Sequence, residues 1–133
     1  VHVYLKRFTQ KKLQNHQVFH LIDSQIVNRY LKNFMKCLTA KVFRTCHASR
    51  KFESLLLSNN KISNFKKHFK ECNSAVAHLC NHTSLTTSTN NYIDPRIVIA
   101  FTKKYKLKLS DFYSLHQLEI HNWALGTPES FRF

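Results

Sequence analysis

Apolar residues recur at steps of three and four along most of this chain, which is the spacing of one face of an α-helix. An amphipathic helix is predicted to begin at Val1. A second should follow Asp23, whose carboxylate can cap it, with apolar positions continuing to Met35. Thr39 can cap a third helix that runs toward Leu57. The first part of the chain is therefore predicted to be helical.

In the third predicted helix, polar and apolar side chains separate onto two faces. The inward face should carry Val42, Phe43 and Cys46, whereas Lys41 and Arg44 lie away from it. A basic side chain on the outer face of a helix is held by a rigid support. We therefore expect Arg44 to project from a well-defined position.

A fourth helix is predicted after the polar break at 58–60, with its apolar positions at Phe65, Phe69, Cys72, Val76 and Leu79. His82 lies at or just past the end of this helix. Residues 83–91 are rich in Thr, Ser and Asn, a composition that predicts a solvated connector.

The last part of the chain predicts two more helices. Asp94 and Pro95 form a cap and first helical residue, and this fifth helix should reach the basic cluster at 103–108. Ser110 can cap a final helix that carries Trp123. The single glycine, Gly126, makes hairpin-rich sheets improbable, so the predicted fold class is mainly all-α.

Composition limits the function classes. Lys and Arg number 21 against seven Asp and Glu, and the net charge of +14 predicts a polyanionic partner, best met by nucleic acid. Neither a signal-peptide pattern nor an apolar run of about 18 residues is present, so a membrane partner is not expected. The four cysteines lack C-x-x-C spacing and are predicted to be buried free thiols in a reducing compartment. H-E-x-x-H is absent too, and no metal is expected.

Three short sequence motifs carry more specific information about function. They are Thr-Ala-Lys-Val-Phe-Arg-Thr at 39–45, Leu-Cys-Asn-His at 79–82 and Asn-Tyr-Ile-Asp-Pro-Arg-Ile at 91–97. Each resembles a catalytic-core motif of the eukaryotic-type type IB DNA topoisomerases. The similarity extends over nearly the whole chain. It implies the C-terminal helical part of the fold shared by type IB topoisomerases and tyrosine recombinases.

The resemblance implies a specific chemistry. Tyr92 would attack a DNA phosphodiester and form a 3′-phosphotyrosine bond, so that supercoiled duplex DNA relaxes before resealing, without ATP, metal or other cofactor. Arg44 and His82 would stabilise the charge on the phosphate oxygens, and Lys41 and Asn91 would contact DNA. Taken singly, such residues are more often structural; His82 could simply close a helix, and Lys41 could be solvated.

The resemblance also implies how the chain is divided and which catalytic residues of the family it lacks. Residues 1–82 would be the helical part of the catalytic core, 83–91 a short connector in place of the family's long linker, and 92–133 the tyrosine-bearing segment. A second arginine and a general-acid lysine of the family are not found here, so an upstream fragment or subunit is expected to supply them. The eukaryotic-type motifs suggest a nuclear protein, and the short connector is also typical of smaller viral members.

Two other functions remain open. A tyrosine recombinase shares the chemistry and fold, although its histidine of the H-x-x-R motif is replaced here by Lys41 in the run that ends at Arg44. A basic DNA-binding relative without catalytic activity would also fit the charge and the missing arginine and lysine.

Overall fold

The computed structural model describes residues 1–58, 62–81 and 92–133. These residues form two compact units, Val1–Val42 and Phe43–Phe133. The described part of the chain is helical and contains no strand, so the predicted all-α class is confirmed. His82 and the predicted connector at 83–91 lie outside the described residues.

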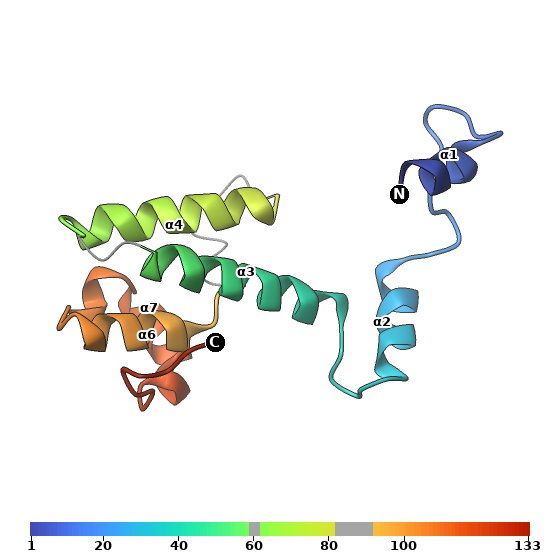
Figure 1. Cartoon of the computed structure of the whole chain (residues 1–133). Coiled ribbons are helices and arrows are strands. Elements are labelled where there is room, and N and C mark those ends of the chain that lie inside the picture. The colour runs from blue at the N-terminus through green and yellow to red at the C-terminus, as the bar shows by residue number, and fades with distance from the viewer. Residues whose placement is uncertain (59–61, 82–91) are drawn as a thin grey trace. The chain divides into compact units, whose positions relative to one another are not determined.

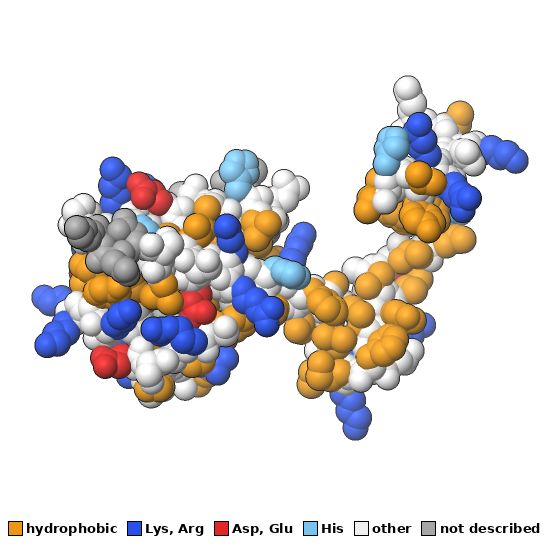
Figure 2. Space-filling model, viewed as in Figure 1, with side chains coloured by type: hydrophobic (Ala, Val, Ile, Leu, Met, Phe, Trp, Pro, Cys, Tyr) orange, Lys and Arg blue, Asp and Glu red, His pale blue; other side chains and the backbone are white. Residues whose placement is uncertain are grey.

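The first unit contains helices α1 (His2–Thr9) and α2 (Ser24–Lys32) and the start of α3 (Ala40–Leu57). The Asp23 carboxylate accepts a hydrogen bond from the Ile26 amide at 2.8 Å, which confirms the predicted cap. Neither α1 nor α2 buries a residue, and Figure 2 shows hydrophobic side chains on the surface of this unit.

The predicted extent of the second helix is wrong at its end. Phe34 and Met35 lie beyond Lys32 and are exposed. The amides of Asn33 and Phe34 donate to carbonyls three residues back, at Tyr30 and Leu31, which tightens the turn and ends the α-helix. The apolar periodicity continues past the point where the backbone changes geometry.

Helix α3 begins directly after Thr39 and ends at Leu57, as predicted. Its buried face is formed by Ala48, Ser49, Phe52 and Leu56. Val42 and Phe43 are 43% and 49% exposed, so their predicted inward position is wrong within the described residues. The amphipathic stripe is present in the sequence, but only the second half of the helix has a core to cover it.

Helix α4 (Phe65–Leu79) packs beside α3 in the second unit (Figure 1). The rings of Phe52 and Phe69 join the two helices in an edge-to-face contact with centroids 5.4 Å apart. Leu79 is exposed, contrary to the prediction, because the buried stripe of Cys72, Asn73, Val76 and Ala77 continues at Cys80 and leaves Leu79 to one side of it.

Helix α6 (Pro95–Lys104) is the central element of this core. Asp94 caps it and Pro95 is its first residue, as predicted. It is buried nearly all round, at Pro95, Ile97, Val98, Ile99, Ala100, Phe101 and Thr102, which is the pattern of a helix covered on every side. Its N-terminus is therefore held in place by the packing of the whole helix.

The final predicted helix is wrong in its start and its length. A short 3₁₀ helix, η1 (Leu109–Asp111), comes first, and α7 (Leu115–Ile120) then starts after Ser114 rather than after Ser110. Ser114 and Gln117 cap each other reciprocally, and this capping box decides the start. A second 3₁₀ helix, η2 (Asn122–Ala124), follows, and Trp123 is exposed.

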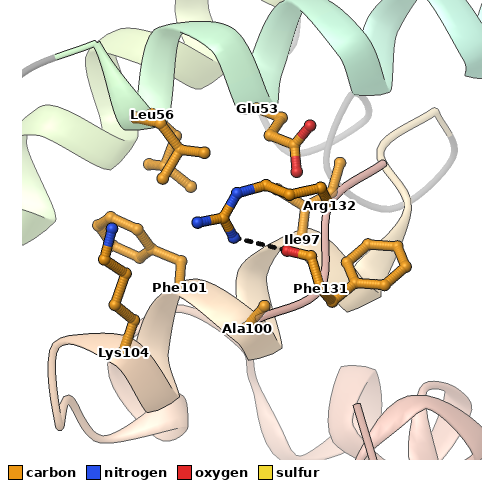
Figure 3. Close-up of a pocket in the computed structure, with 9 residues that line it drawn as sticks. Glu53, Leu56, Ile97, Ala100, Phe101, Lys104, Phe131 and Arg132 are labelled. Carbon is orange, nitrogen blue, oxygen red and sulfur yellow. Dashed lines mark hydrogen bonds between the residues drawn. The ribbon is translucent and has the colours of Figure 1, made fainter. Parts of the chain in front are cut away.

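The last residues return to α3 and α6. The Phe133 amide donates to the Glu53 carboxylate at 2.9 Å. Beside this contact Arg132 donates to the Phe131 carbonyl at 2.7 Å, and the surrounding residues enclose a cavity of about 10 Å³ (Figure 3). A space of that volume holds about one water molecule, so it is a packing defect and not a ligand pocket.

The cysteines are all free thiols, but they are not all buried. Cys72 and Cys80 are buried, Cys46 is half-buried and Cys37 is exposed. The prediction of four buried thiols is therefore confirmed for Cys72 and Cys80, wrong for Cys37 and met only in part by Cys46. Across the described ranges, no helix combines the length and apolar character needed to cross a membrane.

Candidate active site

Tyr92 lies two residues before the cap of α6 and is half-buried. The guanidinium carbon of Arg44 lies 5.8 Å from the centre of the Tyr92 ring, within cation–π range. Arg44 projects from α3 and is exposed. Two residues separated by almost fifty positions in the sequence, both singled out from their motifs, are thus brought side by side.

Ser49 joins the backbone of the Tyr92 segment to α3. Its hydroxyl donates to the Tyr92 carbonyl at 3.2 Å and accepts from the Asp94 amide at 2.9 Å. The side chain is completely buried. Sequence reasoning missed Ser49, although a serine on the core-facing side of a helix was a usable signal, because a buried hydroxyl requires a partner.

Asp94 is also held by Arg96. The Asp94 carboxylate accepts from the Arg96 amide at 2.9 Å, from Nε at 3.0 Å and from Nη2 at 2.8 Å. The hydrogen bond from Arg96 to Asp94 raises the pKa of the Arg96 guanidinium. Arg96 in turn lies over the rings of Phe131, at 4.7 Å, and Trp123, at 5.9 Å. The start of α6 is consequently fixed by two side chains, Ser49 and Arg96.

Of the other predicted site residues, the structure describes Lys41 alone. Lys41 is an exposed residue in the first turn of α3 and belongs to the first unit. His82 and Asn91 lie outside the described residues. Helix α4 ends at Leu79, and Asn81 has φ 56°, the left-handed conformation common after a helix end, directly before His82.

Histidines at four-residue spacing occur twice in the sequence, at His16 and His20 and at His78 and His82. Of the first pair, His20 contacts the Lys12 ammonium through Nδ1 at 2.9 Å. The residues with described positions contain no group of three or more His, Cys, Asp and Glu side chains that could hold a metal ion.

Basic side chains are frequent on the surface of the second unit. Lys and Arg side chains are spread over the visible face of the second unit (Figure 2). Two acidic groups there already have basic partners, since Asp94 pairs with Arg96 at 2.8 Å and Asp111 pairs with Lys66 at 2.9 Å. Such a surface favours the binding of a polyanion.

Comparison with known proteins gives a consistent result. A family model described as eukaryotic DNA topoisomerase I, catalytic core, matches residues 1–111. DNA topoisomerase 1 of Drosophila melanogaster is 38% identical over 200 aligned positions, which cover 97% of this chain and 21% of the fly protein. The Candida albicans protein of that name is 37% identical over 76 residues, 55% of this chain and 10% of its own. The Homo sapiens protein is 34% identical over 82 residues, 59% of this chain and 11% of its own.

The chain spans about a fifth or less of the length of these relatives. The fly alignment of 200 positions is longer than the 133 residues of this chain, so the fly protein has residues within the matched span that this chain lacks. The family model nevertheless matches most of the chain, from residue 1 to residue 111. The chain therefore belongs to the family of the eukaryotic DNA topoisomerase I catalytic core.

Proposed function

We propose that this chain is the C-terminal part of the catalytic core of a type IB DNA topoisomerase, with Tyr92 as the nucleophile. The observation that carries the proposal is the position of the Arg44 guanidinium, 5.8 Å from the centre of the Tyr92 ring. The eukaryotic relatives, each named DNA topoisomerase 1, support duplex DNA as the partner and the nucleus as the location.

The proposed reaction exchanges one phosphodiester for another. The Tyr92 hydroxyl gives up its proton as its oxygen attacks the phosphorus in line; the bond to the 5′-oxygen breaks, and that oxygen gains a proton and leaves as a 5′-hydroxyl. The strand is then joined to Tyr92 through its 3′-phosphate. Rotation of the free end relaxes the DNA, and attack by the 5′-hydroxyl reverses the step. Because each step replaces one phosphodiester bond by another, the reaction needs neither ATP nor an oxidant.

Arg44 has the main electrostatic role in this proposal. In-line attack places extra negative charge on the nonbridging phosphate oxygens, and a fixed cation stabilises that charge without reorganising. A guanidinium is always charged and can donate two parallel hydrogen bonds to those oxygens.

The remaining roles depend on residues whose contacts with this site are still predictions. His82 would donate one more hydrogen bond to the phosphate, and Lys41 and Asn91 would contact the DNA. A second arginine, and a lysine that protonates the leaving 5′-oxygen, would come from an upstream fragment or subunit. The organisation into 1–82, 83–91 and 92–133 is part of the same proposal.

The test is to trap the covalent intermediate. The chain is mixed with the upstream core segment of the fly relative and a suicide duplex, whose short 5′-hydroxyl fragment diffuses away after cleavage. Denaturing electrophoresis then detects a DNA–protein adduct. We expect an adduct from the wild type and none from Tyr92→Phe, with DNA binding retained.

Tyr105→Phe is the matched control. It makes the same chemical change at the opposite end of α6, where the Tyr105 ring packs on Phe65 and Phe101. This variant should form the adduct normally. An adduct from Tyr92→Phe would assign the chemistry to another residue. DNA binding without any adduct from the wild type would indicate the non-catalytic relative, and strand exchange between two defined sites would indicate a recombinase.

A further inference from the structure

Ser49 lies on the same helix as Arg44 and bonds to the backbone at Tyr92. It lies on α3 five residues after Arg44, which corresponds to an advance of about 7.5 Å along the helix. Its hydroxyl bonds to the backbone on both sides of Ile93, at the Tyr92 carbonyl and the Asp94 amide. A single side chain thus attaches the Tyr92 backbone to the helix that carries Arg44.

The attachment is protected from solvent. Ser49 is 0% exposed and Ile93 is 4% exposed, so water does not compete for these hydrogen bonds. Asp94 is fixed independently by the carboxylate contacts with Arg96. The Ser49 hydroxyl therefore holds the backbone of the Tyr92 segment to α3, and Arg96 holds the Asp94 side chain.

We propose that Ser49 is a positioning residue for strand cleavage, and that its buried hydroxyl sets the place of Tyr92 relative to Arg44. The inference rests on the proposed function. Reaction rates depend steeply on the placement of the reacting groups, and a displacement of about 1 Å can reduce a rate about a hundredfold. Ser49 acts through the backbone that holds the tyrosine, and its role requires no contact with the DNA.

The test compares Ser49→Ala with Thr102→Val. Thr102 is also buried, and its hydroxyl donates to the Ile99 carbonyl at 2.9 Å within α6. Each variant removes one buried hydroxyl; Thr102→Val loses one hydrogen bond and Ser49→Ala loses two, but only Ser49→Ala releases the Tyr92 backbone. Thr102→Val therefore controls for a general loss of stability.

Two measurements are made on the full chain, with the upstream segment added for the second. Hydrogen exchange of the Asp94 amide is expected to accelerate about tenfold or more in Ser49→Ala and to change little in Thr102→Val. Single-turnover adduct formation on the suicide duplex should slow by about ten- to a hundredfold in Ser49→Ala, while the Kd for the uncleaved duplex stays the same.

The outcomes separate the two proposals. Equal cleavage rates for Ser49→Ala and Thr102→Val would overturn the positioning role, as would an unchanged Asp94 exchange rate. A weaker Kd with a normal cleavage rate would also overturn it, because the hydroxyl would then serve binding. A wild-type chain that forms no adduct overturns the proposed function itself, and the catalytic consequence of Ser49 falls with it.

Discussion

Replacing Asp94 by Ala removes two stabilising features of one side chain. The carboxylate caps α6 through the Arg96 amide, and it also pairs with the Arg96 guanidinium through two further hydrogen bonds. The side chain of Asp94 is 13% exposed and that of Arg96 is 40% exposed. We expect Asp94→Ala to destabilise the second unit markedly.

The size of the effect follows from its two parts. Loss of an N-cap to Ala costs about 0.5–2 kcal/mol. The ion pair adds at most about 1 kcal/mol, because the partly exposed guanidinium is screened by water. A total of about 2 kcal/mol corresponds to a Tm lower by about 10 °C for a unit of roughly 90 residues. Asp94→Asn keeps an oxygen that can cap the helix and should lower the free energy of unfolding by about 1 kcal/mol or less.

Thermal unfolding followed by circular dichroism measures these changes, with Asp23→Ala as the control. Asp23 caps α2 with a 2.8 Å hydrogen bond, but α2 buries no residue. Its loss should leave the melting of the second unit unchanged. A Tm for Asp94→Ala that matches the Asp23→Ala value would refute the reasoning, since it would mean that neither the cap nor the ion pair stabilises this core.

Three further predictions concern single side chains. Arg44→Ala should slow adduct formation by about a hundred- to a thousandfold, the range found when one preorganised donor is removed, and Arg44→Lys should recover only part of the rate because it lacks the guanidinium fork. Burial raises the pKa of the Cys72 thiol to about 11, so iodoacetamide at pH 8 should label the exposed Cys37 much faster, as mass spectrometry would show. Burial lowers the pKa of His121 below its usual 6.5, so the unfolded chain binds more protons and stability falls as the pH drops below 6.5. In urea titrations at pH 7 and pH 5, His121→Gln should reduce this loss, and the exposed His116→Gln should not.

Local signals make part of the fold predictable. Asp23 and Asp94 are recognisable as caps because an acidic side chain before a periodic run needs no distant partner to bond the first free amides. The choice between Ser110 and Ser114 is harder, because both are serines before apolar residues. The glutamine three residues after Ser114, which bonds back to the Ser114 amide, is the signal that separates them.

Distant packing is the part that local patterns cannot supply. Val42 and Phe43 fit an apolar stripe, but a stripe does not say which part of the chain covers it. Ser49 depends on the approach of a backbone more than forty residues away. The positions of Tyr92 and Arg44 could be anticipated only through their motifs, and the roles of Lys41, His82 and Asn91 stay predictions.

The absence of buried residues in α1 and α2 has a practical consequence. Helices of eight and nine residues are marginal without tertiary packing, and this stretch contains many lysines and arginines. Trypsin should digest α1 and α2 well before it digests the enclosed α6. Samples kept without protease inhibitors would then lose their amino-terminal helices first, and a shortened band on a gel would not by itself mean that Tyr92 had been lost.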